Sequence, residues 1–293
     1  MRSGLFVGLS TVDIAYRVKS YPAEDSKTQA LDQYAGAGGP ATNAAVAYAA
    51  LGGAPTLLTA VGSHRLADLI RGDLSTHGVD VADVLPESGH TPPVSSIVVS
   101  DSTSTRTVVS LDGSRITADF QQSMFDHLDG VDVVLVDGHY PQLAISLCEE
   151  AAQREVPVVL DAGRWKDAHS DLLPFVHTAI CSAAFNPPGT SPGDMDAVFA
   201  FVQSAGVGNV AVTNGANPIV GLAGTRRFEI AVPATNAVDT LGAGDILHGA
   251  YCFFASDASS FESSLTRASR VASFSCRYFG TREWCSHINE VHE

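Results

Sequence analysis

The sequence predicts an α/β fold, with a doubly wound, mostly parallel β-sheet flanked by helices and a small separate β-sheet. Short apolar runs alternate with segments of helical spacing along most of the chain, which is typical of a parallel sheet covered by helices on both faces. Two regions break this rhythm and carry alternating polar and apolar residues instead. We therefore expect residues 1–293 to form a single domain whose second, smaller sheet is a lid.

Each apolar run of the expected core is short, as strands buried on both faces are. The runs are Leu5–Leu9, Thr56–Val61, Val131–Val136, Val156–Leu160 and Val210–Thr213. The segments of helical spacing between them are Ala41–Leu51, Leu66–His77, Leu143–Arg154 and Met195–Ala205. In such sheets ligands bind beyond the carboxyl ends of the strands, so we expect a site in the loops that follow these runs.

The two alternating regions, at about residues 13–35 and 94–112, predict the lid. Val94–Ser100 and Arg106–Leu111 flank a polar stretch, which predicts a β-hairpin. An alternative is that the strands of both regions extend the main sheet. Exposed apolar strands can pair with another chain, and this predicts a homodimer formed through the lid.

Charge and composition argue against several classes of partner. The chain has 32 acidic and 17 basic residues and a net charge of −15, which disfavours nucleic acids and anionic membranes as partners. No apolar stretch approaches the ~18 residues of a membrane span, and the N-terminus lacks the apolar core of a signal peptide. The five cysteines form no CxxC pair, which disfavours a disulfide framework and a zinc cluster. We expect a cytoplasmic protein with no metal-ligating side chains.

The segment 239–245 reads Asp-Thr-Leu-Gly-Ala-Gly-Asp and precedes a helix with small residues. Glycines let backbone N–H groups approach an anion closely, and the start of a helix adds the positive end of a dipole. A carboxylate here, that of Asp245, can accept a proton from a hydroxyl group while the amides hold phosphate charge. From this segment alone, Asp245 can also be interpreted as a helix N-cap.

A second glycine-rich segment, 36–43, opens another helix of very small residues. Such a helix must lie close against another element. Asn43 offers both donors and acceptors, as a ligand rich in hydroxyl groups requires. An ordinary asparagine at the start of a helix is the alternative interpretation.

Together the two segments resemble the two signatures of the ribokinase-like (phosphofructokinase B type) carbohydrate kinase family. Gly38, Gly39 and Asn43 are similar to its N-terminal signature, and residues 239–245 are similar to its Asp-Thr-x-Gly-Ala-Gly-Asp signature, in the expected order. The resemblance covers essentially the whole chain, including the lid. It implies a ribokinase-like fold and transfer of the γ-phosphate of ATP to a sugar hydroxyl, with Mg²⁺ carried by the ATP.

The resemblance also implies roles for individual residues. The catalytic group would consist of the base Asp245 and an anion hole formed by Gly242, Ala243 and Gly244. The sugar contacts would come from Asp13, Gly38, Gly39 and Asn43. The nucleotide contacts would come from Thr213 and Gly215, in a turn that resembles the one cupping the nucleotide, and from Asp239 and Thr240.

Residues 103–107 resemble the ketohexokinase branch of the family, in which an arginine lies near the transferred phosphate. This resemblance assigns Arg106 to the substrate site. Pro40 stands where that branch has an amide side chain, which weighs against fructose as the substrate. Residues 181–185 carry no acid where many relatives have an Asn-x-x-Glu segment tied to magnesium, and the segment 277–285 has no assignable cation site.

His139 and Arg164 follow two predicted strands and are expected to face the site, where they can bind a charged or extended substituent. The acceptor can therefore be a free sugar, a nucleoside, or an acidic sugar or sugar phosphate. A relative that binds a sugar or nucleotide without catalysis is a further alternative. A dinucleotide-binding dehydrogenase and a P-loop enzyme are disfavoured, because the sequence contains neither Gly-x-Gly-x-x-Gly after the first strand nor Gly-x-x-x-x-Gly-Lys-Ser/Thr.

Overall fold

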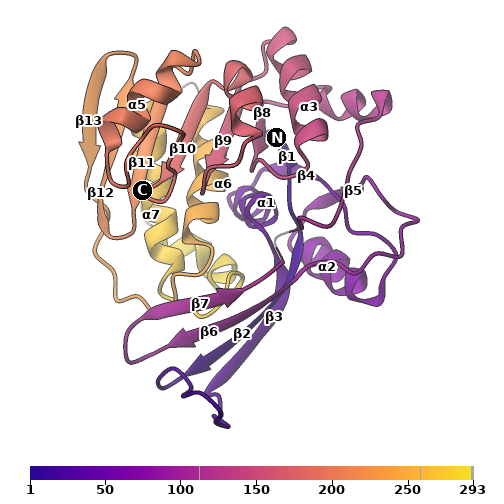
Figure 1. Cartoon of the computed structure of the whole chain (residues 1–293), viewed down its shortest axis with the longest axis vertical. Helices are drawn as coiled ribbons and strands as arrows, with labels where there is room; N and C mark the ends of the chain where they lie inside the picture. Colours follow the sequence, from indigo (N-terminus) through magenta and orange to yellow (C-terminus); the bar gives the residue numbers. More distant parts are fainter. Residues whose placement is uncertain (112, 258, 292–293) are drawn as a thin grey trace.

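The computed structural model describes residues 1–111, 113–257 and 259–291. These residues form two β-sheets with helices packed against the larger one (Figure 1). Within these residues, the larger sheet has nine strands in the order β13-β12-β11-β10-β9-β8-β1-β4-β5, and the smaller has four in the order β3-β2-β6-β7. The predicted fold class, a mostly parallel sheet flanked by helices with a second small sheet, is confirmed. The alternative in which the second set of strands extends the main sheet is wrong.

The strands of the larger sheet are mostly parallel, and only the pairs β11–β12 and β12–β13 of the described residues are antiparallel. They are β1 (Ser3–Val7), β4 (Ala54–Thr59), β5 (Asp80–Asp83), β8 (Val133–Val136), β9 (Val158–Ala162), β10 (Thr178–Ser182), β11 (Asn209–Asn214), β12 (Asn217–Ala223) and β13 (Arg226–Ile230). The five predicted core strands are present with boundaries shifted by a few residues. Sequence reasoning missed β5, β10, β12 and β13. Of these, β5 and β13 are the two edge strands and carry charged residues, which hides the apolar pattern of a buried strand.

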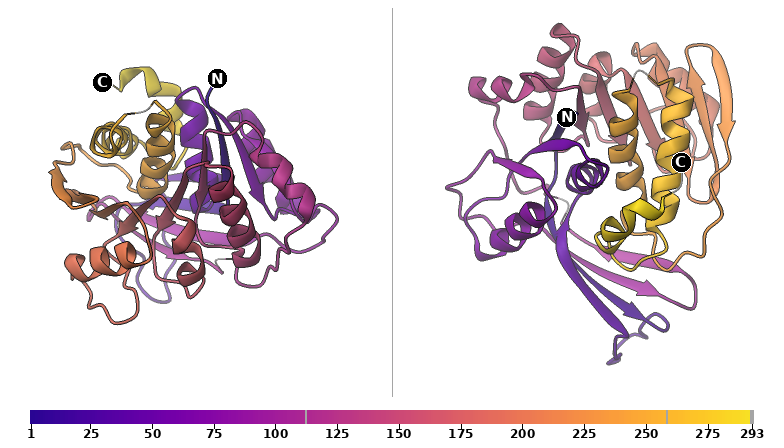
Figure 2. Two further views of the ribbon diagram at one scale, coloured as in Figure 1. Left: turned by 90° about the horizontal axis from the view of Figure 1, so that it is seen from above. Right: turned by 180° about the vertical axis from the view of Figure 1, so that it is seen from behind.

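Side chains alternate across the larger sheet, so a separate core forms on each face. Phe6 and Leu57 belong to one core, and Leu5 and Val7 to the other. The first face is covered by α1 (Pro40–Ala50), α2 (Arg65–Thr76), α6 (Ala243–Ala255), α7 (Phe261–Ser275) and η3 (Glu283–Glu290), as Figure 2 shows from behind. The second face is covered by η1 (Gln122–Leu128), α3 (Pro141–Gln153), α4 (His169–Leu172), η2 (Leu173–Phe175) and α5 (Met195–Ser204). No helix in the described part of the chain is both long and apolar enough to cross a bilayer.

The second sheet projects from the core as a separate layer (Figures 1 and 2). Its strands are β2 (Thr11–Val18), β3 (Asp32–Gly38), β6 (Val94–Ser100) and β7 (Thr105–Val109). The chain passes from β1 into β2 through residues 8–10 and returns from β3 into α1 through Gly39. The second sheet is therefore joined to the core at the carboxyl end of β1, where a ligand site is expected.

The hairpin predicted at Val94–Ser100 and Arg106–Leu111 is confirmed as the antiparallel pair of β6 and β7. Residue 112, the predicted end of the lid, and residues 292–293, the predicted end of the domain, lie outside the described residues.

Helix α1 lies directly against α6, as the run of very small residues in α1 predicts. Gly249 of α6 has no side chain, and a Cβ placed there would lie 2.0 Å from the carbonyl oxygen of Ala44. Ala41, Ala44 and Ala45 of α1 are fully buried. Any larger side chain at these contacts would push the two helices apart, because protein interiors are close-packed.

We expect Gly249→Ala to destabilise the protein, by about 1–3 kcal/mol, because the added methyl group overpacks a contact with backbone atoms. The matched control is Gly72→Ala in α2, since a Cβ at Gly72 meets no atom within 4 Å. The control should be neutral or stabilising by up to about 1 kcal/mol, the gain in helix propensity. Urea unfolding of both variants measures the difference. Equal stabilities for the two variants would contradict the tight contact.

Candidate functional site

The loop before α6 and the first turn of α6 contain the residues predicted to bind an anion. Gly242 is the N-cap of α6 and has a left-handed backbone with φ of 69°. A Cβ at Gly242 would lie 2.8 Å from Cγ2 of Thr281, so only glycine fits there. The first N–H groups of a helix have no partner within the helix, so this loop can bind an anion. Because Gly242 is the N-cap, the interpretation of Asp245 as the N-cap is wrong.

Two side chains fix the shape and surroundings of this loop. Both carboxylate oxygens of Asp239 accept backbone hydrogen bonds, from Leu241 at 2.9 Å and from Gly280 at 3.0 Å. Arg106 reaches over from β7 of the second sheet, and its Nη1 donates to Oγ1 of Thr240 at 2.6 Å. The structure thus brings a positively charged group of the second sheet to the edge of the glycine loop.

Asp245 lies in the first turn of α6 and is held by Asn43 from the first turn of α1. Nδ2 of Asn43 donates to Oδ2 of Asp245 at 2.8 Å, across 202 residues of sequence. Asn43 is buried, whereas Asp245 keeps partial exposure to solvent. The close contact between α1 and α6 therefore brings residues of the two glycine-rich segments within hydrogen-bond distance of each other.

The surroundings of Asp245 make its carboxyl a weaker acid than an exposed one. Burial, followed by the negative charge of Asp161, raises the pKa of the Asp245 carboxyl to about 7. The hydrogen bond from Asn43 and the proximity of His248 lower the pKa of Asp245, and the negative charge of Asp13 raises it. A carboxyl group with this pKa can take up and release a proton near neutral pH.

Asp13 lies on β2, buried at the junction of the two sheets. Oγ1 of Thr11 donates to its Oδ1 at 2.6 Å, and burial raises the pKa of the Asp13 carboxyl. A Cβ at Gly38 would lie 2.1 Å from the carboxyl carbon of Asp13, and a Cβ at Gly39 would lie 2.1 Å from the carbonyl oxygen of Leu9. Glycine is therefore needed at position 38 for the chain to pass this close to Asp13, and at position 39 for it to pass this close to Leu9.

Asp137, at the end of β8, organises the region next to Asp13. Its Oδ2 accepts hydrogen bonds from the amides of Leu9 at 2.9 Å and Ala41 at 3.2 Å. Its Oδ1 accepts the amide of His139 at 2.9 Å and lies 3.0 Å from Nδ1 of the same residue. Burial opposes ionisation of Asp137, but the nearby His139 and Lys166 and the amide of Leu9 together hold the pKa of this carboxyl below its usual range.

Asp161, at the end of β9, is buried beside His248 of α6. Oδ2 of Asp161 lies 3.4 Å from Nδ1 of His248 and has no hydrogen-bond partner among the described residues. The imidazole ring lies between two carbonyl oxygens, with Nδ1 2.7 Å from that of Gly244 and Nε2 3.0 Å from that of Ile180. Burial raises the pKa of the Asp161 carboxyl, and the proximity of His248 opposes this rise. Arg164, predicted to face the site, is exposed in the loop that follows.

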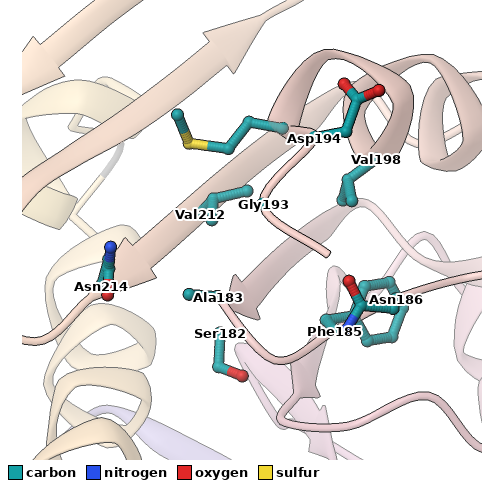
Figure 3. Close-up of a pocket in the computed structure, with 10 residues that line it drawn as sticks. Ser182, Ala183, Phe185, Asn186, Gly193, Asp194, Val198, Val212 and Asn214 are labelled. Atoms are coloured by element: carbon teal, nitrogen blue, oxygen red, sulfur yellow. The ribbon is translucent and has the colours of Figure 1, made fainter. Parts of the chain in front are cut away.

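A pocket of about 90 Å³ lies beyond the ends of β10 and β11 (Figure 3). Its lining residues are Ser182, Ala183, Phe185, Asn186, Gly193, Asp194, Met195, Val198, Val212 and Asn214. Thr213 and Gly215, the predicted nucleotide residues, flank Asn214 in sequence, and Gly215 has a left-handed φ of 57°. No cluster of three or more His, Cys, Asp and Glu residues that could hold a metal ion is found in the described part of the chain.

Sequence reasoning gave no role to three side chains that lie close to the predicted site residues: Asp137, Asp161 and Arg282. The two aspartates follow predicted strands, and their position at the carboxyl ends of these strands could have marked them as candidate site residues. Arg282 donates through Nη1 to Oδ1 of Asn43 at 2.9 Å. No local pattern marks Arg282, because its partner lies 239 residues away in the sequence.

Comparison with protein families and with curated proteins finds similarity to carbohydrate kinases in both cases. The model of the pfkB family carbohydrate kinases matches residues 1–289. Ribokinase of Bacillus subtilis (strain 168) is 22% identical over 297 residues, covering 100% of this chain and 99% of the relative. Ketohexokinase of Mus musculus is 23% identical over 286 residues, covering 93% and 95% of the two chains.

Solved structures show the same fold. A candidate ribokinase from Agrobacterium tumefaciens superposes with a TM-score of 0.83 at 23% identity, covering 100% of this chain and 99% of that one. Ribokinase of Arabidopsis thaliana, solved with ribose and ATP, superposes with a TM-score of 0.77 at 19% identity, covering 99% and 98% of the two chains. The fold of this chain is therefore ribokinase-like.

The raised pKa of Asp245 predicts a pH-dependent change in stability. Its carboxyl has a pKa of about 7 in the folded state and about 3.9 in an unfolded chain. The folded state therefore binds the proton more tightly, and stability falls as the pH rises between these two values. We expect Asp245→Asn to be more stable than the parent by about 1–3 kcal/mol at pH 8, with a smaller difference at pH 5.

Urea unfolding at the two pH values measures this effect. The control is Asp129→Asn, because the side chain of Asp129 is 76% exposed and its ion pair with Arg154 lies on the surface. A stability gain for Asp245→Asn that is the same at both pH values would contradict the raised pKa.

Proposed function

This chain belongs to the pfkB family of carbohydrate kinases, and we propose that Asp245 is the base with which it activates a sugar hydroxyl toward the γ-phosphate of ATP. One observation carries this assignment. The Asp245 carboxylate lies in the first turn of α6, directly after the glycine loop, and Asn43 holds one of its oxygens at 2.8 Å. Base and anion-binding amides are therefore neighbours on one helix.

The chemistry of Asp245 suits a general base. Asn43 donates to Oδ2, and we assign the other carboxylate oxygen to the acceptor hydroxyl. A pKa of about 7 keeps a large part of this carboxyl ionised at neutral pH while making it a stronger base than an exposed aspartate. Asp245 would accept the hydroxyl proton as the alcohol oxygen bonds to the γ-phosphorus and the bond from that phosphorus to the leaving ADP breaks.

The loop before Asp245 would stabilise the charge of the migrating phosphoryl group. Gly242, Ala243 and Gly244 would present backbone N–H groups, and the start of α6 adds the positive end of its dipole. Arg106 is a further donor at this edge, because its hydrogen bond to Thr240 places the guanidinium beside the loop. ATP, when bound, supplies the transferred phosphoryl group, and these residues orient it and neutralise its charge.

We place the sugar between the core and the second sheet. Asp13 would accept hydrogen bonds from sugar hydroxyls, Gly38 and Gly39 allow close approach of the ligand, and Asn43 completes the contact. The surroundings favour an uncharged acceptor over an acidic sugar or sugar phosphate, because the negative charges of Asp13 and Asp161 already act on Asp245. His139 and Arg164 would then select among neutral sugars and nucleosides.

We place the nucleotide near the pocket beyond β10 and β11 (Figure 3). Thr213 and Gly215 would contact it from the turn after β11, and Asp239 and Thr240 from the loop before α6. The residues of the loop fit ATP, since their donors are backbone amides and an arginine. For Mg²⁺ the described residues offer no dedicated cluster of ligands, so Mg²⁺ would be held through the ATP phosphates.

The kinase assignment predicts ATP consumption in a screen of free ketoses, aldoses, nucleosides and acidic sugars. With the sugar found, we expect Asp245→Asn to fold normally and to lower turnover by ~10²-fold or more, the scale of losing a general base. The parent should also lose kcat/KM below about pH 7, where Asp245 becomes protonated.

The exposed variant Asp129→Asn serves as the control and should retain its turnover. Near-normal turnover of Asp245→Asn would remove the base assignment. Binding of a sugar without any ATP consumption would instead favour the non-catalytic relative.

We also propose that the protein is cytoplasmic and forms a homodimer through the second sheet. All five cysteines are free thiols, which fits a reducing compartment. Strand β7 is an edge strand, all its residues are exposed, and Val109 is 70% exposed. An exposed apolar edge of this kind can pair with the same edge of a second copy.

Light scattering tests the dimer. We expect about twice the chain mass of 30.6 kDa, and a shift to the monomer mass in Val109→Lys, because a charge on an edge strand blocks pairing. Ser204→Lys, on an exposed position of α5, adds the same charge elsewhere and should leave the dimer intact. A monomer at all working concentrations would reject the proposal.

A further inference from the structure

Arg282 carries a buried positive charge beside the site. It lies between α7 and η3, and only 8% of its surface is exposed. A buried charge is costly unless ion pairs and hydrogen bonds compensate it. The groups that bind Arg282 therefore indicate its role in the structure.

The guanidinium group binds three separate elements. Its Nε donates to Oδ2 of Asp73 in α2 at 2.9 Å, and its Nη2 donates to the carbonyl oxygen of Ala37 at the end of β3 at 2.6 Å. Its Nη1 donates to Oδ1 of Asn43 in α1 at 2.9 Å. Asp73 also accepts the amide of Ala37 at 3.0 Å. One side chain thus links the second sheet, α2 and the first turn of α1.

The contact with Asn43 determines which way its amide group faces. An arginine can only donate hydrogen bonds, so the oxygen of the Asn43 amide must face it. The NH₂ group then faces Asp245, where it donates at 2.8 Å. If the amide were reversed, its NH₂ group would face the donors of Arg282 and its oxygen would face the carboxylate of Asp245. Neither hydrogen bond could then form.

We propose that Arg282 is a positioning residue, which fixes the Asn43 amide so that it donates to the Asp245 carboxylate and ties this geometry to the end of β3. This inference rests on the proposed role of Asp245 and extends it to a residue that does not touch the substrate. The planar fork of arginine can bind Asn43, Ala37 and Asp73 at once, whereas the single ammonium group of lysine cannot.

The test is the titration of the Asp245 carboxyl carbon, followed by NMR in ¹³C-aspartate-labelled protein and assigned by its loss in Asp245→Asn. In the parent we expect a midpoint of about 7. Arg282→Lys keeps the charge but loses the fork, so the Asn43 amide is free to turn and the midpoint rises. Asn43→Ala should raise it similarly. The double variant should show no further rise, because both changes remove the same hydrogen bond.

Arg277→Lys is the matched control, since Arg277 is exposed and lies over the ring of Phe274; its midpoint should equal that of the parent. Thermal unfolding shows whether each variant folds. If Arg282→Lys does not fold, the uncharged Arg282→Gln takes its place in the same measurement. An unchanged midpoint in the folded Arg282 variant, beside a raised midpoint in Asn43→Ala, would overturn the proposal.

With the sugar from the screen, we expect Arg282→Lys to lower kcat by about 10- to 100-fold, the range seen when a reacting group is misplaced. The loss should vanish in an Asn43→Ala background, where Arg282 has no amide to orient. An equal loss in both backgrounds would show that Arg282 acts elsewhere. The NMR titration needs no substrate, so it separates failure of this inference from failure of the kinase assignment.

Discussion

The contact between α1 and α6 is the constraint on which the site depends. Gly249 lies against the backbone at Ala44, so the two helices approach as closely as main chains allow. This distance brings Asn43, one residue before Ala44, within hydrogen-bond reach of Asp245. A larger side chain at the contact would separate the helices and break the bond between Asn43 and Asp245, although both of these residues would be unchanged.

Negative charge is concentrated where the strands of the larger sheet end, and this concentration is part of the function we propose. Asp161 and Asp13 both act on Asp245 and raise the pKa of its carboxyl. Folding must therefore keep repelling groups together, which lowers stability at neutral pH while it makes Asp245 a better base. The hydrogen bond that Asn43 donates to Asp245 offsets part of this repulsion.

Much of the fold and part of the site could be predicted from the sequence, because their signals are local. Periodicity indicated the core strands and the hairpin of the second sheet, and the glycine segments indicated where Asn43 and Asp245 lie. Contacts between distant segments left no such signal. Arg282 stands in a stretch without a recognisable motif, and the influence of Asp161 on Asp245 depends on burial, which a sequence pattern does not report.

The site also has a consequence for how the chain folds. The hydrogen bond between Arg282 and Ala37 joins residues 245 positions apart, and that between Arg106 and Thr240 joins residues 134 positions apart. Closing loops of this length costs conformational entropy, which local helix formation does not have to offset. The core contact between Gly249 and Ala44 likewise joins distant parts of the chain. The site is therefore assembled only when the N-terminal and C-terminal parts of the chain have come together.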